Sequence, residues 1–168
     1  MKKLLLILLF FLIVPLQAAS AQKIDYALPY PGLLPDSPLY ILKLARDQII
    51  NFFITDPLKK SQFDLLQADK RLASGQYLFA KGSSKYPLMV STISKGENYL
   101  EMAIDNLKVA QKQGEDISGF KSTLETAAKK HQEVIKDLIS KTNGDVKKNL
   151  QNEEKRVEDL VKNTEQFR

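Results

Sequence analysis

Apolar residues recur at helical spacing through most of this chain, and no stretch shows the apolar–polar alternation that is typical of a strand. From Pro38 onward this spacing predicts five helical segments separated by short turns. Short turns favour antiparallel neighbours, and apolar stripes of this kind are expected to pack against one another along the helices. The pattern therefore predicts an all-α fold, an antiparallel bundle of four to five helices.

Capping residues mark the first two helices. Ser37 is suited to cap the first helix, with Pro38 at the first helical position, where its missing N–H costs nothing. Asp56 and Pro57 repeat this pattern at the start of the second helix, and Gly82 is placed to end it. The stripe of the first helix consists of Leu39, Leu42, Ile49 and Phe53, widened by Ile41, Ile50 and Phe52.

The remaining helices are bounded by proline, glycine and polar caps. The third is expected to follow Tyr86-Pro87 and to end at Gly114. The fourth has two possible starts, Asp116 or a capping box at Ser122, and stops at Asn143-Gly144. A last helix follows among many charges. The stripes of the third and fourth helices are Met89, Ile93, Gly96, Leu100, Ala103, Leu107 and Ala110, and Phe120, Leu124, Ala127, His131, Val134 and Leu138.

The first residues carry the pattern of a secretory signal peptide. Lys2 and Lys3 precede an apolar run over residues 4–14, and the small-residue motif Ala19-x-Ala21 before Gln22 is suited to cleavage. We expect residues 1–21 to be removed and the folded part to lie outside the cytoplasm. The alternative is retention as an N-terminal membrane anchor, again with the folded part outside.

The rest of the chain is long enough for one ordinary domain. Residues 22–37 contain three of the seven prolines and predict an extended lead-in segment, and residues 38–168 form the helical bundle. There are no cysteines, so stability must come from buried side chains rather than disulfides. Of the formal net charge of +5, two charges belong to Lys2 and Lys3, so we expect no nucleic-acid partner.

No catalytic, cofactor or metal site is predicted. The one histidine, His131, lies on the apolar stripe of the fourth helix and is expected to pack, semi-buried, among its neighbours. Glu97, Glu101 and Asp105 lie on one face of the third helix at four-residue spacing. We expect that face to be solvated; weak binding of a divalent cation is the alternative. A general-base or pH-sensing role for His131 also stays open.

Three segments resemble a family of secreted bacterial proteins, the domain of unknown function 5667. They are PGLLPDSPLYILK from Pro31 to Lys43, FFITDP from Phe52 to Pro57 and, more loosely, KHQEVIKDL from Lys130 to Leu138. The resemblance implies a helical extracytoplasmic domain, sometimes attached to membrane-anchored regulators or surface proteins. It implies no activity, cofactor or catalytic residue.

The first of these segments also has a physical interpretation. Its residues can rigidify and cap the approach to the first helix and hold the lead-in segment against the bundle, or they can edge a groove that binds a partner. These candidate clamp or partner-binding residues are Tyr30, Leu33, Leu34, Pro35, Asp36, Ser37, Pro38, Leu39 and Tyr40.

The leading functional hypothesis is a non-enzymatic extracytoplasmic module that mediates protein–protein interaction or has a structural role in the cell envelope. The expected partner is an envelope protein or polymer, and a membrane is contacted only through the N-terminal segment if that is uncleaved. The alternatives are an envelope holdase that shields apolar segments of other chains, and a signal-anchored extracytoplasmic sensor or regulator.

Overall fold

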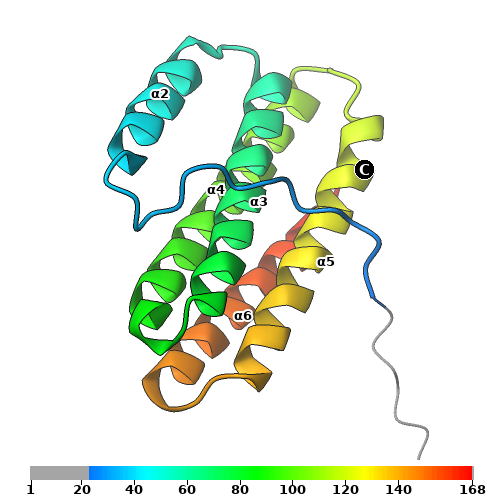
Figure 1. The fold of residues 1–168 in the computed structure, drawn as a ribbon. Helices are drawn as coiled ribbons and strands as arrows, with labels where there is room; N and C mark the ends of the chain where they lie inside the picture. Colours follow the sequence, from blue (N-terminus) through cyan, green and yellow to red (C-terminus); the bar gives the residue numbers. More distant parts are fainter. Residues whose placement is uncertain (1–22, 168) are drawn as a thin grey trace, which may run out of the picture.

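The structure, a computed structural model, describes residues 23–167. The predicted signal peptide over residues 1–21 and its cleavage residues Ala19, Ala21 and Gln22 lie outside the described residues. Within them are five antiparallel α-helices and no strands, which confirms the predicted all-α fold (Figure 1). The helices are α2 (Tyr40–Phe53), α3 (Pro57–Ala80), α4 (Tyr86–Lys112), α5 (Ser118–Ser140) and α6 (Gly144–Thr164), with a 3-10 turn η2 (Ser83–Lys85) between α3 and α4.

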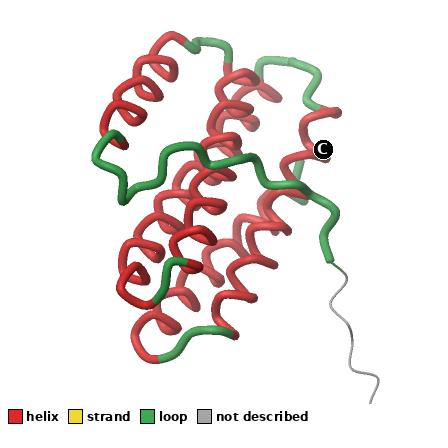
Figure 2. The backbone as a smooth tube through the Cα atoms, in the orientation of Figure 1, coloured by secondary structure: helices red, strands yellow, loops and turns green. Residues whose placement is uncertain are grey.

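Four of these helices form the bundle, and α2 lies to one side of it. α3 packs most extensively against α4, α5 packs against α6, and α4 also contacts α6. Among the described residues, α2 packs extensively against no other helix. Figure 2 shows the lead-in segment crossing the face of the bundle formed by α5 and α3 before it turns into α2. No described helix combines the length and the hydropathy needed to cross a membrane.

The caps predicted for the first two helices have different outcomes. Asp56 caps α3 as expected, since Lys59 N donates to Asp56 Oδ1 over 2.8 Å. The predicted Ser37 cap is wrong, because α2 begins at Tyr40 and no side chain caps it. The amides of Ser37 and Tyr40 instead each bond a carbonyl three residues back, so Pro38 lies in a turn that precedes the helix.

The start of α5 distinguishes the two predicted alternatives. α5 begins at Ser118, whose amide donates to Asp116 Oδ1 over 3.0 Å. The Asp116 alternative is therefore close to the observed start. Ser122 lies inside the helix, where its amide already has an intrahelical partner, so the predicted capping box there is wrong.

The core of the bundle consists of two apolar clusters at different levels along the helices. Both draw residues from α3, α4, α5 and α6. One contains Leu65, Ala68, Leu100, Ala103, Ile104, Leu107, Ala110, Ile117, Leu124, Ala127, Ala128, Leu160 and Phe167. The other contains Leu72, Leu78, Met89, Ile93, Val134, Ile135, Leu138, Leu150 and Val157. Three polar side chains lie between the two clusters and are described below.

Two glycines let α3 and α4 approach closely. A Cβ on Gly75 would lie 2.6 Å from Ile93 Cγ1, and a Cβ on Gly96 would lie 3.3 Å from the Ala68 carbonyl oxygen. Ile93 is fully buried and β-branched, so it has little room to move away. The absence of a side chain at these positions therefore sets how closely the tightest helix pair packs.

This close approach predicts that Gly75→Ala destabilises the protein. We expect a loss of about 1–3 kcal/mol in the free energy of unfolding, measured by urea denaturation, because the core becomes overpacked. Gly119→Ala is the matched control: a Cβ on Gly119 would have no other atom within 4 Å, so this substitution should be neutral or stabilise by up to about 1 kcal/mol. Equal effects of the two substitutions would contradict the packing argument.

Candidate functional site

The apolar stripe of α2 faces solvent instead of the bundle, so the expectation that it packs inside the fold is wrong. Phe52, Phe53 and Ile41 are 81%, 74% and 70% exposed. Leu42 and Ile49 are also more than half exposed, and the buried residue of this helix is Asp47. Successive residues of an α-helix are rotated by about 100° around its axis. At that rotation these five apolar residues lie on one continuous side of α2.

The inner face of α2 is polar because the bundle and the lead-in segment offer it polar partners. Arg71 Nη1 donates to the Tyr40 hydroxyl over 2.8 Å, and the Arg71 guanidinium also lies 4.8 Å from the centroid of the Tyr99 ring. Lys43 Nζ donates to the Pro31 carbonyl oxygen over 2.7 Å. A cavity of about 230 Å³ remains between α2, α3 and α4. The helix is thus held by a few polar contacts rather than by an apolar seam.

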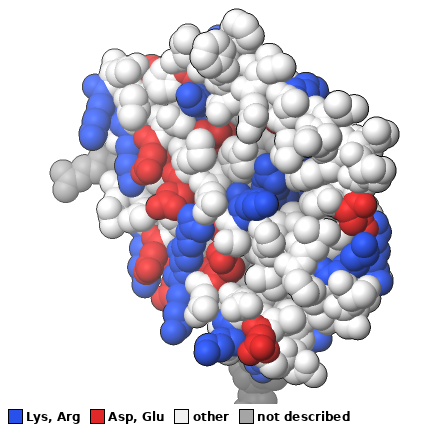
Figure 3. All heavy atoms as spheres, turned by 90° about the vertical axis from the view of Figure 1, so that its left-hand side faces the viewer, with Lys and Arg blue, Asp and Glu red and all other residues white. Residues whose placement is uncertain are grey.

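The outward face of α2 joins a larger uncharged surface. Figure 3 shows the side of the molecule that includes α2, where a broad white area occupies much of the upper part. Acidic and basic side chains alternate in a separate band on the same side. The white area includes uncharged polar residues as well as apolar ones, but five large apolar side chains exposed on one side of α2 are by themselves typical of an interaction site.

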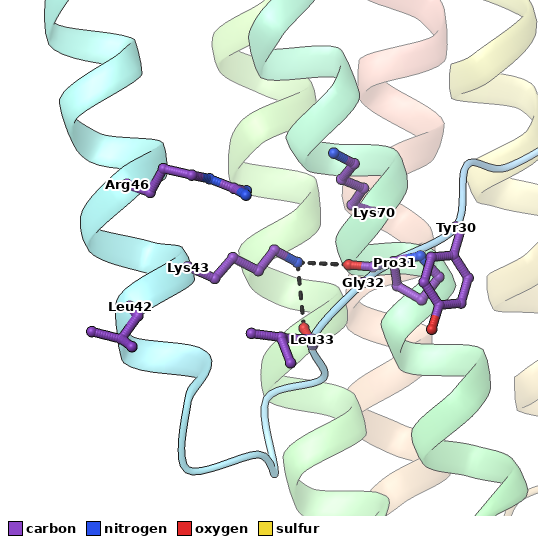
Figure 4. Close-up of a pocket in the computed structure, with 8 residues that line it drawn as sticks. All are labelled: Tyr30, Pro31, Gly32, Leu33, Leu42, Lys43, Arg46 and Lys70. Atoms are coloured by element: carbon purple, nitrogen blue, oxygen red, sulfur yellow. Dashed lines mark hydrogen bonds between the residues drawn. The ribbon is translucent and has the colours of Figure 1, made fainter.

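Beside this surface lies a cationic pocket between α2, α3 and the lead-in segment (Figure 4). It has a volume of about 460 Å³. Lys43 and Arg46 of α2 and Lys70 of α3 extend into it from its two sides, as the close-up shows. Its other lining residues are Tyr30, Pro31, Gly32, Leu33 and Leu42, so no acidic residue lines it.

Positive charges crowd this pocket. Burial lowers the pKa of the Lys43 ammonium, and the nearby cations Lys70, Arg71 and Arg46 lower it further, although Asp47 acts in the opposite direction. Asp47 lines the neighbouring cavity between α2, α3 and α4, and its Oδ1 accepts from Arg46 Nη2 over 2.6 Å. The pocket therefore has more positive charge than its one acidic neighbour neutralises.

The predicted clamp residues are divided between this pocket and the bundle. Tyr30 and Leu33 line the pocket, and Tyr40 contacts Arg71. Asp36 forms ion pairs with Lys81 and Lys85 at 2.8 and 3.3 Å, which lower the pKa of its carboxyl group. Leu34, Pro35 and Ser37 are partly buried, whereas Pro38 and Leu39 are exposed.

The lead-in segment is fastened to the bundle through polar contacts. Ile24 N donates to Glu133 Oε2 over 2.6 Å, and Lys130 Nζ donates to the Ile24 carbonyl oxygen. The Tyr26 hydroxyl donates to Asp69 Oδ2 over 2.5 Å. Burial and the charge of Asp69 raise the pKa of Tyr26, so the phenol stays protonated and continues to donate.

Asp69 belongs to a buried ionic layer, formed with Glu97 and His131, that separates the two apolar clusters. His131 Nδ1 lies 2.9 Å from Glu97 Oε1, and His131 Nε2 lies 3.0 Å from Asp69 Oδ1. His131 and Glu97 are completely buried and Asp69 is nearly so. Burial by itself lowers the pKa of the His131 imidazolium, but the two carboxylates outweigh it and raise the pKa to about 10.

The sequence only partly predicts this layer. Its pattern predicts a semi-buried His131, whereas the side chain is fully enclosed. The expectation that Glu97 lies on a solvated face is wrong, whereas Glu101 and Asp105 are exposed as expected. A signal is present, since each residue of the ionic layer has an apolar residue four positions before it and three positions after it.

The ionic layer lacks the geometry of a catalytic or metal site. Both ring nitrogens of His131 are engaged by carboxylates, so neither can accept a proton from a serine or a substrate. The two carboxylates lie on opposite sides of the ring instead of converging on one point. Within residues 23–167, no group of three or more His, Cys, Asp or Glu side chains could hold a metal ion.

A comparison of the chain with known protein families identifies the family to which it belongs. The family described as Domain of unknown function (DUF5667) matches residues 32–166, which include the pocket, α2 and the ionic layer. The chain belongs to the DUF5667 family. Neither the curated proteins nor the solved structures contain a match to this chain.

The contact between Tyr26 and Asp69 predicts how the lead-in segment of this DUF5667 domain is held. In Tyr26→Phe the hydrogen bond to a carboxylate is lost, which costs about 1.5–3 kcal/mol locally. Amide hydrogen exchange at Ile24 and Tyr26 should therefore become roughly tenfold faster or more, while the bundle stays protected. Tyr77→Phe is the matched control, because Tyr77 is half exposed and its ring, which packs edge-on against Tyr30 of the lead-in segment, is kept in the variant. Unchanged exchange in Tyr26→Phe would contradict this role.

The ionic layer predicts a pH-dependent stability. Because folding raises the pKa of His131, its stabilising effect is fully present below its ordinary pKa of 6.5 and is lost as the pH rises towards about 10. We expect the free energy of unfolding to fall between pH 7 and pH 10, and to fall less in Glu97→Gln. At pH 7 this substitution should cost on the order of 3 kcal/mol.

The matched control is Asp137→Asn, which removes a carboxylate from an exposed ion pair with Lys141 at 2.7 Å. Such a pair is worth less than about 1 kcal/mol. Urea denaturation across the pH range compares the two variants. If Glu97→Gln lowers the free energy of unfolding no more than Asp137→Asn does, the ionic layer does not stabilise the DUF5667 fold.

Proposed function

We propose that this protein is a non-enzymatic, extracytoplasmic module of the cell envelope that binds a partner protein through the outward apolar face of α2. The observation that carries the proposal is the orientation of this helix, with its apolar side in solvent and its polar side on the bundle. The signal-peptide pattern of residues 1–21 supports an extracytoplasmic location.

The energetics of α2 favour a partner that covers it. Burying one large aliphatic or aromatic side chain contributes roughly 1.5–3 kcal/mol. In the isolated domain Phe52, Phe53 and Ile41 stay mostly exposed, so most of the free energy that their burial would contribute is not gained. A partner helix that packs along α2 buries these side chains and gains that free energy. Amphipathic helices pair in this way through apolar residues three and four positions apart.

Charge favours a different protein over a second copy of this chain. Arg46 lies near the middle of α2, where the helix borders the cationic pocket, and 60% of its side chain is still exposed to solvent. Two copies related by a two-fold axis and paired antiparallel through α2 would bring their two Arg46 side chains close together at the edge of the interface. Like charges so placed oppose pairing, whereas a helix from another protein need not carry a cation there.

The buried ionic layer supports the non-enzymatic part of the proposal. His131 is the single histidine in the chain, and both of its ring nitrogens are engaged in the core. A general base must reach the proton that it abstracts from a substrate. A histidine sealed between two carboxylates and two apolar clusters has no such access.

The test combines crosslinking with a double substitution. A photo-crosslinking amino acid at position 52 in the native cell is expected to give a discrete adduct, whose protein is identified by mass spectrometry and purified. Phe52→Ser combined with Phe53→Ser should weaken binding to that purified protein at least tenfold. Because both side chains are largely exposed, the free energy of unfolding should change by no more than about 0.5 kcal/mol.

Val109→Ser is the matched control, since Val109 is a partly exposed apolar residue that belongs to α4 and not to α2. It should leave binding unchanged. The proposal fails if position 52 crosslinks only to a second copy of this chain or only to lipid. It also fails if the identified protein binds the double variant as tightly as the wild type.

A further inference from the structure

The cationic pocket of Figure 4 lies between α2, α3 and the lead-in segment, and of the outward apolar residues of α2 only Leu42 lines it. Lys43 and Arg46 come from α2, and Lys70 comes from α3, so two helices supply the charge. No acidic side chain lines the pocket. We propose that this pocket binds the phosphate group of a phosphate ester.

Enough hydrogen-bond donors remain in the pocket to hold such a group. Lys43 Nζ has three donors, of which two are directed at the carbonyl oxygens of Pro31 and Leu33. Arg46 uses Nε and Nη2 for Asp47, which leaves about three of its five N–H donors. The Lys70 ammonium has no hydrogen bond or ion pair to any described residue. The free donors therefore point in from both sides of the pocket.

The number and placement of these donors favour phosphate over carboxylate. A carboxylate has two acceptor oxygens and one negative charge, whereas a phosphate monoester has three terminal oxygens and a charge between about −1.5 and −2 near neutral pH. Three cations, partly offset by Asp47, match the larger charge. Arginine binds phosphate through its planar fork and lysine binds it as a point charge, so both kinds of contact are present.

The rest of the pocket suits the organic part of an ester. Its volume of about 460 Å³ exceeds what a phosphate ion needs, and its remaining side is lined by Tyr30, Leu33 and Leu42. The phosphate oxygens then face the cations, and the ester group lies against these apolar side chains. The ester can be free or the headgroup of phosphatidic acid, because the phosphate of that lipid is also a monoester and presents the same three terminal oxygens to the cations.

Calorimetric titration of the purified protein with inorganic phosphate and with sn-glycerol 3-phosphate tests this proposal. We expect saturable binding of the ester, weakened at least tenfold in Arg46→Gln and in Lys70→Gln. Lys155→Gln is the matched control: it removes one exposed positive charge on α6 and should change the affinity less than twofold. Because a bound anion favours the charged form of Lys43, NMR titration should show the pKa of its ammonium rising with the ester present.

Two further arms identify the source of the phosphate. Sedimentation with vesicles that contain phosphatidic acid, whose headgroup is a phosphate monoester, compared with vesicles of phosphatidylcholine, tests a lipid headgroup. Binding to the anionic vesicles that depends on Arg46 and Lys70, without binding of the free ester, supports the proposal with a lipid as the source. Acetate and glutarate test a carboxylate ligand.

The proposal is overturned if the carboxylates bind as tightly as the ester, if Lys155→Gln weakens binding as much as Arg46→Gln, or if neither the ester nor the vesicles bind. None of these results bears on the docking of a protein on α2, which is measured with Phe52 and Phe53. The two proposals therefore fail or stand separately.

Discussion

The ion pairs of His131 with Glu97 and Asp69 are the interaction on which the rest of the structure depends. They connect α3, α4 and α5 at one level of the bundle, between two apolar clusters. Apolar stripes alone tolerate sliding along a helix, because one aliphatic layer can replace another at similar cost. A buried charged group cannot slide without losing its partner, and an unpaired buried charge costs several kcal/mol. The ionic layer therefore sets the register of three helices.

A continuous series of contacts leads from this layer to the surface. Asp69 accepts a hydrogen bond from Tyr26, which holds the lead-in segment across the bundle. The same segment presents its Pro31 carbonyl oxygen to Lys43 of α2. The position of α2, and with it the cationic pocket, thus depends on a segment fastened to the core by polar contacts. Polar contacts of this kind hold α2 in place without burying its apolar face, which leaves that face available to a partner.

Much of the fold could be predicted from particular residues. Asp56 and Pro57 start α3, and Gly82 and Gly114 lie at the ends of α3 and α4 with positive φ, which an L side chain rarely adopts. The ionic layer and the pocket could not be predicted in the same way. Glu97 has the same spacing to Glu101 and Asp105 that a solvated face would have. Only the juxtaposition of α3, α4 and α5 shows that Glu97 and Asp69 face one histidine.

The sequence by itself determined the helices, their approximate ends and the all-α bundle, because periodicity and capping are local properties of the chain. It also carried the segments that resemble the DUF5667 family, to which the family match assigns the chain. The tertiary structure decided which way α2 faces. Its pattern has an apolar side and a polar side, and helical spacing is the same whichever side meets the bundle. Carbonyl oxygens of the lead-in segment and the Arg71 guanidinium supply partners for the polar side, so α2 turns its apolar residues towards solvent.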